Sequence, residues 1–354
     1  PDSSEKLEKL EKEFDDSSKK NVLDHLTTSE KVRLKASNIA KEDYFVHMDT
    51  LLNILRWNGS PKCRLSFDCR KIVEIDMKKW KQEDPSLVFS HKRKIVSTKD
   101  RAGQLYIALR KEDRVPVLLK TFCNWEEHKK SVLKEIAFHM FMSNNINCTK
   151  LLDVYQNHKE VWAVIEYCDA GNLLDLIPIA PLTEPEMAYI TTHILRALDY
   201  LHQNDKMHRN LTTSSILLNT IGDVLVSDFE MWIGRNLQRF WLPPETLQPS
   251  PKPYGKPVDI WCLGCILLEM ANGAVPYKNL HPVKELFLTA TVGLPLLEGR
   301  KWSNEFKDFV ENCIRMEPSQ RSTARELLED PWLKTALSRK EFAATVPGRM
   351  FYTR

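Results

Sequence analysis

The residues best able to do chemistry lie in one segment, residues 206–232, which reads KMHRNLTTSSILLNTIGDVLVSDFEMW. Its pattern predicts a loop, a strand, a turn at Gly222-Asp223, a second strand and another loop. Such a hairpin would bring two polar triplets together, His208-Arg209-Asn210 and Asp228-Phe229-Glu230. The chemistry that these side chains could share is proton transfer and the stabilisation of charge.

The elements that must position these triplets change in character along the chain. Up to about residue 167 the sequence is rich in short strand candidates, which are HKRKIV, QLYIAL, VPVLLKTF, KLLDVY and EVWAVIEY, with the helical stretch EEHKKSVLKEIAFHMF between the third and fourth. From Thr183 the chain reads mostly helical. The first long helix is expected over 184–203, with one apolar stripe at Met187, Ile190, Ile194, Leu195, Leu198 and Leu201. A β-rich lobe followed by a helical lobe predicts an α+β fold with a cleft.

The overall composition is that of an ordinary globular protein. The 354 residues contain 51 Lys+Arg and 48 Asp+Glu, for a net charge of +3, and 42% of them are hydrophobic. These values exclude collagen-like, low-complexity and wholly disordered chains, and they argue against a polycationic nucleic-acid binder. The longest apolar run, Ile260 to Leu268, is too short to span a membrane. We therefore expect no nucleic-acid and no membrane partner.

The N-terminal region differs from the rest of the chain. Residues 1–85 are dense in charge and predicted to be partly helical; their start, PDSSEKLEKLEKEF, has no signal-peptide core. Because no initiator Met is present, we expect a piece of a longer protein. The predicted organisation is an extension at 1–85, a folded domain at 86–337 (N-lobe 86–166, C-lobe 171–337) and a tail at 338–354.

The 8 cysteines are scattered through the chain, which predicts reduced thiols and a cytoplasmic location, with the nucleus as the alternative. Cys262 and Cys265 form a C-x-x-C within the apolar run IWCLGCILLEM. No second Cys/His pair has ligand spacing, so helix packing is favoured over a redox or zinc site.

The ordered motifs resemble those of the protein-kinase superfamily over about Ser90 to Leu333. The two triplets are similar to its catalytic loop and its metal-binding loop, and VDIWCLGCILLEM is similar to the central helix of its helical lobe. Lys120, at the end of VLLK, resembles the strand lysine, and Glu135 follows where its helix partner belongs. The other matching positions are Glu245, Asp259 and Arg321. The resemblance implies a two-lobed kinase-like fold. Within the superfamily, the sequence most resembles the STE group (Ste20/p21-activated or MAP kinase kinase kinase types).

Three catalytic-loop positions depart from the family's pattern. Asn210 replaces the aspartate that accepts the hydroxyl proton, which an amide cannot do. Thr212 stands in place of the lysine that steadies the γ-phosphate, and Ser215 in place of the asparagine that holds the second Mg²⁺. Three polar roles are thus changed within six residues.

The nucleotide positions implied by the resemblance are Lys120, Glu135, Gly103, Leu118, Glu166, Cys168, Leu217 and Asp228, of which Asp228 is the metal ligand if Mg²⁺ binds. Only Gly103 remains of three phosphate-loop glycines, since Thr98 and Asp100 occupy the other two positions. Leu118 replaces the small alanine that covers adenine, and Glu230 replaces the glycine after the metal-binding aspartate. We expect a site partly filled by its own side chains.

The activation segment between Asp228 and Glu245 is short and contains no Ser, Thr or Tyr between its flanking motifs. Ordering by phosphorylation is therefore not expected there. If its aromatic residues Trp232, Phe240 and Trp241 are exposed, they would serve as anchors for a protein partner.

These departures predict a pseudokinase, a kinase homologue that works as a protein-interaction or allosteric signalling module with a kinase or another signalling protein as partner. This interpretation requires no cofactor and allows only weak binding of ATP and Mg²⁺. Two alternatives stay open because Lys120, Glu135 and Asp228 are retained. They are a weakly active or atypical Ser/Thr kinase that transfers the ATP γ-phosphate, and a nucleotide sensor without turnover.

Overall fold

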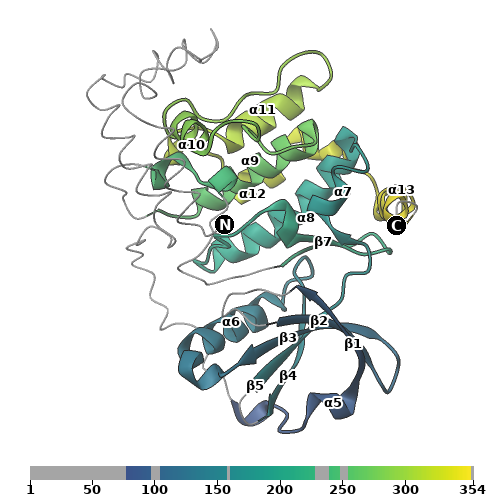
Figure 1. Ribbon diagram of the computed structural model, residues 1–354. Helices are drawn as coiled ribbons and strands as arrows, with labels where there is room; N and C mark the ends of the chain where they lie inside the picture. The colour runs from purple at the N-terminus through teal and green to yellow at the C-terminus, as the bar shows by residue number, and fades with distance from the viewer. Residues whose placement is uncertain (1–76, 97–103, 158–159, 228–238, 248–253, 352–354) are drawn as a thin grey trace. The chain divides into compact units, whose positions relative to one another are not determined.

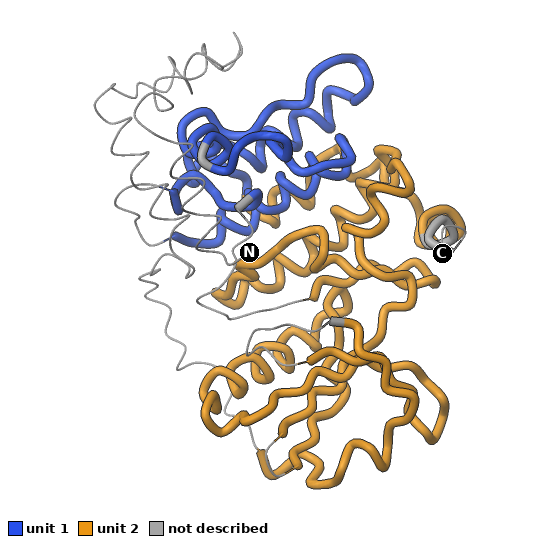
Figure 2. The backbone as a smooth tube through the Cα atoms, viewed as in Figure 1, with its two compact units in different colours: residues 1–66, 233–322 blue, residues 67–232, 323–354 orange. Residues whose placement is uncertain are grey.

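A computed structural model describes residues 77–96, 104–157, 160–227, 239–247 and 254–351. The chain divides into two compact units, residues 1–66 with 233–322 and residues 67–232 with 323–354 (Figure 2). The predicted helices of the N-terminal extension lie at 1–76, outside the described residues.

The second unit begins with a five-stranded antiparallel sheet (Figure 1). Its strands are β1 (Phe89–Val96), β2 (Gln104–Arg110), β3 (Pro116–Cys123), β4 (Leu151–Asn157) and β5 (Glu160–Glu166), in the order β1-β2-β3-β5-β4. Helix α6 (Lys129–Met142) lies between β3 and β4 in sequence and follows the 3-10 turn η3 (Trp125–His128). All five predicted strands and the predicted helix are confirmed, with shifts of a few residues at their ends.

Strand alternation places Leu118, Lys120 and Phe122 on one face of β3 and Val117 and Leu119 on the other. The first face contributes to a core with α6, made by Trp80, Phe122, Trp125, Val132, Ile136, Val154, Val161, Ala163 and Ile165. The second contributes to a separate core, made by Phe89, Ala108, Val117, Leu119, Tyr155 and Val164. The sheet is therefore packed on both faces.

The same unit continues with helical and hairpin elements. Strands β6 (Gly171–Asn172), β7 (Ile216–Leu218) and β8 (Val224–Val226) form a small sheet, accompanied by α7 (Leu173–Leu176), α8 (Glu184–Gln203), α12 (Ala324–Leu328), η8 (Pro331–Thr335) and α13 (Arg339–Phe351). Helix α8 has the predicted bounds because Thr183 and Glu186 form a capping box at its start, with the Thr183 amide 2.8 Å from a Glu186 carboxylate oxygen. Its predicted apolar stripe is fully buried.

The first unit contains the helices that follow the activation segment. They are α9 (Pro257–Asn272), α10 (Pro282–Thr291) and α11 (Asn304–Cys313), with the short turns η5 (Arg239–Trp241), η6 (Pro244–Thr246) and η7 (Pro318–Gln320). Gly264 lets α9 approach the end of α11, because a Cβ at this position would overlap Ile314. Cys262 and Cys265 are buried in α9, where burial raises the pKa of both thiols, so the packing interpretation of the C-x-x-C is confirmed.

Two segments outside the five-stranded sheet add to the second unit. Trp80 is only 6% exposed and packs against Trp125 at a ring distance of 6.0 Å, and the Lys81 amide donates to Val154 O on the edge of β4 at 3.0 Å. Packing on the sheet thus starts before residue 86, and at the other end residues 339–351 form helix α13. The domain boundaries themselves stay a prediction.

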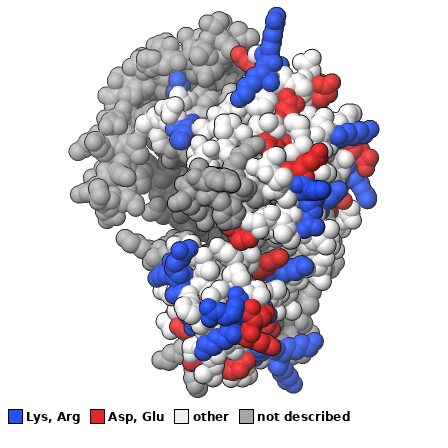
Figure 3. Space-filling view, turned by 90° about the vertical axis from the view of Figure 1, so that its right-hand side faces the viewer, with Lys and Arg blue, Asp and Glu red and all other residues white. Residues whose placement is uncertain are grey.

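Two surface properties bear on the partner classes. No helix in the described ranges is long and apolar enough to cross a membrane. On the face shown in Figure 3, basic and acidic side chains are interspersed, as the small net charge leads one to expect. The described part of the chain is thus an α+β structure with a sheet-rich N-terminal lobe and helices after it, which confirms the predicted fold class.

Candidate functional site

The strand lysine and the helix glutamate form an ion pair. Lys120 Nζ on β3 lies 2.5 Å from Glu135 Oε1 on α6, and both side chains are 13% exposed. The Lys120 ammonium also lies 5.7 Å from the ring centroid of Phe122 on the same face of β3. A close pair of this kind holds helix α6 against the sheet.

His139 follows Glu135 by one turn on α6 and is half-buried. Its Nε2 lies 3.0 Å from Thr149 O, so this nitrogen carries the proton and donates to the carbonyl. Burial lowers the pKa of His139 to about 4, and the Lys120 charge acts in the same direction. His139 is thus a partly buried histidine held by a hydrogen bond to the backbone.

The catalytic-loop histidine has a defined tautomer. His208 is 2% exposed, and its Nε2 donates to Ser227 O at 2.8 Å, because a carbonyl oxygen can only accept. The backbone N–H of Asn210 donates to Nδ1 of the same ring at 3.3 Å. The ring thus joins the catalytic loop to the residue after β8. Arg209, between His208 and Asn210, adopts φ 67°, a left-handed conformation that is uncommon for residues other than glycine.

The two other altered loop residues bond to each other. Thr212 and Ser215 are 3% and 1% exposed. The Ser215 hydroxyl donates to Thr212 O at 2.8 Å and accepts the Thr212 amide at 3.0 Å. The Thr212 hydroxyl lies 2.8 Å from that of Ser214. The loop is therefore closed by its own short side chains.

Leu118 lies on the face of the sheet that packs against helix α6. It is half-buried, packs against that core and is the register partner of Ile165 on β5. The three carbons that leucine adds to alanine are thus held beside another branched side chain.

Three further positions that the resemblance assigns to a nucleotide lie at the end of β5, in the segment after it and on β7. Glu166 ends β5, and its carboxylate accepts the Lys150 amide at 3.3 Å. Cys168 is 7% exposed, and burial raises the pKa of its thiol to about 12, so it is no nucleophile at neutral pH. Leu217 is half-buried on β7 opposite Leu225.

Several predicted site residues lie outside the described residues. They are Thr98, Asp100, Gly103, Asp228, Phe229, Glu230 and Trp232. In the part of the chain that the structure describes, no three His, Cys, Asp or Glu side chains lie together as a metal site.

Two of the three activation-segment aromatics, Phe240 and Trp241, lie in the described residues. Trp241 is only 5% exposed, and its carbonyl accepts the Cys262 thiol at 3.6 Å. Phe240 is half-buried and contacts Trp241 edge to face at 6.0 Å. The condition set from the sequence, that these aromatic residues be exposed, is therefore not met for Trp241.

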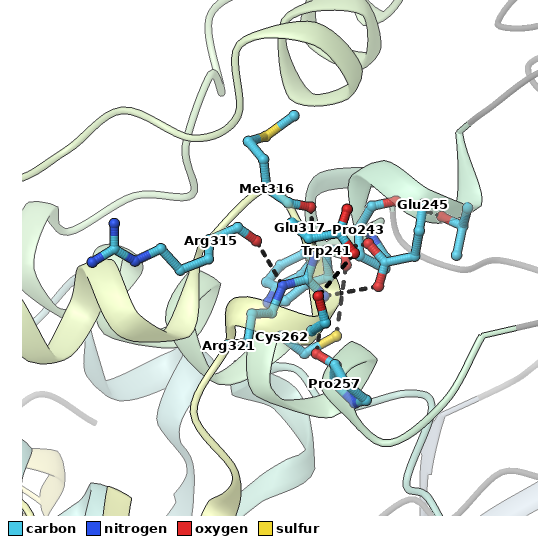
Figure 4. A network of polar contacts seen from close by, with 11 residues as sticks. Trp241, Pro243, Glu245, Pro257, Cys262, Arg315, Met316, Glu317 and Arg321 are labelled. Carbon is cyan, nitrogen blue, oxygen red and sulfur yellow. Dashed lines mark hydrogen bonds and ion pairs between the residues drawn. The ribbon is translucent and has the colours of Figure 1, made fainter. Parts of the chain in front are cut away.

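Arg321 lies in a network of polar contacts within the first unit, shown in Figure 4. Its side chain is fully buried and forms two 2.8 Å bonds with the two carboxylate oxygens of Glu245. Its other three N–H groups donate to the carbonyls of Arg315, Pro257 and Met316 at 2.8, 3.1 and 3.3 Å. Its guanidinium carbon also lies 4.9 Å from the Trp261 ring centroid. All five donors of the guanidinium are thus used.

The comparison with protein families identifies the class. The protein kinase domain matches residues 100–333, so this chain belongs to the protein kinase family. It is similar to "Serine/threonine-protein kinase pakC" of Dictyostelium discoideum, with 29% identity over 334 residues, which cover 88% of this chain and 69% of that protein.

Sequence reasoning missed three connections at the site. Ser227 supplies the carbonyl for His208, Ile165 packs across from Leu118, and the Thr220 hydroxyl donates to Asp169 at 2.7 Å. A backbone carbonyl leaves no mark on a residue type, so the first had no signal. The second follows from strand register, which the pairing order of the strands would have revealed.

Proposed function

We propose that this chain is an STE-like pseudokinase, a kinase-fold module that acts through protein contacts rather than phosphoryl transfer. The observation that carries this proposal is the closed loop at Thr212 and Ser215. A hydroxyl has one donor and two lone pairs. At Ser215 the donor and one lone pair are used by the Thr212 backbone, on a side chain that is 1% exposed. Little capacity is left for a Mg²⁺ ligand, which must present an oxygen.

Asn210 supports the same conclusion from a different step of the reaction. General-base catalysis is worth about 10²–10⁴-fold, and an amide cannot supply it. The buried Thr212 has neither the charge nor the length to reach a γ-phosphate. Base, phosphate and metal functions are therefore impaired together.

Leu118 supports weak nucleotide binding. Packed beside Ile165, it occupies space where the family places a small side chain over adenine. In this proposal no cofactor is required, and ATP with Mg²⁺ binds weakly at most through Lys120, Glu135 and Asp228.

The partner in this proposal is another protein, a kinase or a signalling component, and the compartment is the cytoplasm, with the nucleus as the alternative. The intact Arg321–Glu245 network supports a folded interaction module, because it stabilises helices and bears no nucleotide. Because Trp241 is buried, this proposal places the protein contact on the exposed side of helix α6 and not on Trp241.

Two measurements on the purified chain test the proposal. A thermal-shift titration with ATP, with and without Mg²⁺, is expected to show no shift at millimolar nucleotide. Labelled-phosphate transfer to a generic Ser/Thr substrate is expected to stay at background. If transfer occurs, and Lys120→Met abolishes it while the exposed-lysine control Lys130→Met does not, the pseudokinase proposal is wrong.

A weakly active Ser/Thr kinase is the second candidate, and the observation that favours it is the 2.5 Å Lys120–Glu135 pair. This pair is part of the machinery that positions nucleotide phosphates. A sensor that binds ATP without turnover is the third candidate. A thermal shift without phosphate transfer would select the sensor, whereas transfer that depends on Lys120 would select the kinase.

A further inference from the structure

Helix α13 lies beyond the family's domain and yet packs on it. The kinase domain match ends at residue 333, and α13 runs over Arg339–Phe351 in the same compact unit as α8, β7 and β8. Ser338 begins the helix with a capping pair, its hydroxyl donating to Glu341 at 2.6 Å. The helix therefore lies outside the residues that match the family's domain.

The apolar side of α13 packs on helix α8. Phe342 stacks on Tyr189 with ring centroids 4.4 Å apart and planes at 25°. Phe342 and Val346 have no exposed surface, and their spacing of four residues places both on one side of the helix. Lys340 and Ala344 lie on the exposed side.

The polar contacts of α13 hold the turn between β7 and β8. Arg339 donates to Ile221 O at 3.2 Å and forms a 2.7 Å ion pair with Asp223. The Tyr189 hydroxyl donates to Gly222 O at 2.9 Å. Gly222 has φ +89°, and a Cβ there would lie 2.8 Å from Arg339 O. Only glycine allows the helix to approach the turn so closely.

The same turn is bonded to the hinge, the segment 167–172 that follows β5. The Thr220 amide and hydroxyl donate to the two carboxylate oxygens of Asp169 at 2.8 and 2.7 Å, directly after Cys168. The position of α13 is therefore linked through this turn to the segment beside the nucleotide positions.

A second line of contacts leads from Tyr189 to β8. The Tyr189 ring lies 4.5 Å from His193, whose Nδ1 is 2.6 Å from Asn147 Nδ2. Burial lowers the pKa of His193 to about 4, so its neutral ring accepts this bond. Asn147 O accepts the Val226 amide at 2.8 Å, two residues before Asp228.

The helix is weak in itself. Pro347 and Gly348 lie within α13, where proline has no backbone N–H to donate to Ala343 O. Glycine at the next position further lowers helix propensity. We therefore expect α13 to be a weak helix without its contacts to α8 and to the turn between β7 and β8.

We propose that α13 is a detachable intramolecular ligand, and that its seat is a docking site for amphipathic helices of the pattern Arg-x-x-Phe-x-x-x-Val. The seat is defined by Tyr189 and the turn residues Ile221, Gly222 and Asp223. Asp223 and the Ile221 carbonyl select the arginine, and Tyr189 selects the phenylalanine. While α13 occupies the seat, its contacts fix the positions of the turn and of the hinge. When α13 leaves the seat, a partner helix of the same pattern binds there. The proposal goes beyond the function proposed above and does not depend on loss of catalysis.

The test uses the full chain and a fluorescent peptide with the sequence of residues 337–354. In Phe342→Ala the seat is vacated, and the peptide is expected to bind at least about tenfold more tightly than to the wild type, measured by anisotropy. The matched control is Lys340→Ala, at an exposed position of the same helix, which is expected to behave as wild type. A peptide with R339A and F342A is expected not to bind.

Hydrogen exchange tests the link to the hinge in the same variants. Amides at 167–172 and 219–224 are expected to exchange at least about tenfold faster in Phe342→Ala and at the wild-type rate in Lys340→Ala. Arg339→Ala is the second variant, because its side chain is 57% exposed and its loss leaves the core intact. The peptide is tested against both Phe342→Ala and Arg339→Ala. If it binds neither of them more tightly than the wild type, or if the amides of the turn and hinge exchange in both at the wild-type rate, the proposal is overturned.

Discussion

Replacing Arg321 with lysine should destabilise the first unit although the charge is kept. The side chain is fully buried, and each of its five N–H groups has an acceptor. A lysine has three donors on a single atom, so it cannot bond both oxygens of Glu245 and three separate carbonyls. At least two buried acceptors would be left without a donor.

The magnitude follows from the acceptors that are lost. A buried group left without its hydrogen bond costs about 1–3 kcal/mol, so two such groups cost roughly 2–6 kcal/mol. Removing one partner of a buried pair costs about 3–5 kcal/mol. We therefore expect Arg321→Lys to lower the free energy of unfolding by about 3 kcal/mol, and Glu245→Gln, which leaves the guanidinium unpaired, by a similar or larger amount.

The assay must report on this unit alone, since the chain contains two compact units. Hydrogen exchange of α9 and α11 under denaturant provides this readout. The control is Arg315→Lys, whose pair with Glu311 is on the surface, with both side chains more than 40% exposed. That control is expected to change stability by less than about 1 kcal/mol. If Arg321→Lys matches the control, the buried network does not stabilise this unit as its hydrogen bonds imply.

Three further predictions concern the candidate site. Leu118→Ala should lower stability by about 1–3 kcal/mol and make the chain respond to millimolar adenosine in a thermal-shift assay, in which the wild type stays silent. Asn210→Asp alone should leave phosphate transfer at background, because Ser215 still closes the loop; restored transfer would show that the other substitutions are harmless. The low pKa of His139 means that the unfolded chain binds more protons below pH 6.5, so the contribution of His139 to stability should fall as the pH drops from 6.5 to about 4, by at most about 3 kcal/mol, and His193, with a similarly low pKa, should add to this slope. His139→Leu should reduce the slope of stability against pH by the part that His139 contributes, and an unchanged slope would assign it to other groups.

Local patterns predicted the elements well, because the forces that set them act within a few residues. Helix α8 has the expected bounds since its capping box and its apolar stripe both lie within the segment. The strands followed from short β-rich runs, and the burial of Cys262 and Cys265 followed from the apolar run around them. The ion pair of Lys120 and Glu135 could be expected only from the resemblance, because no local pattern joins a strand residue to a helix residue.

Interactions between distant segments were not predictable in the same way. Trp241 was a possible surface anchor if exposed, but it is buried and bonded to Cys262 of helix α9. Residues 338–354 were predicted only as a tail, whereas residues 339–351 form a helix that packs on Tyr189 and approaches Gly222. In both cases the decisive partner lies many residues away in sequence.

The closed catalytic loop contributes to the proposed loss of activity in a second way, because it leaves little room for a larger side chain at position 215. Restoring Ser215→Asn would add two heavy atoms to a side chain that is 1% exposed and would remove the hydroxyl that bonds the Thr212 backbone. Overpacking of this kind typically costs about 1–3 kcal/mol. A chain with all three family residues restored at 210, 212 and 215 must therefore open the loop before it can hold a metal. We expect the phosphate-transfer activity of this restored chain to stay low although its three catalytic-loop residues are those of the family. A second change that loosens the loop, such as Ser214→Gly, should raise that activity in the restored chain and not in the wild type.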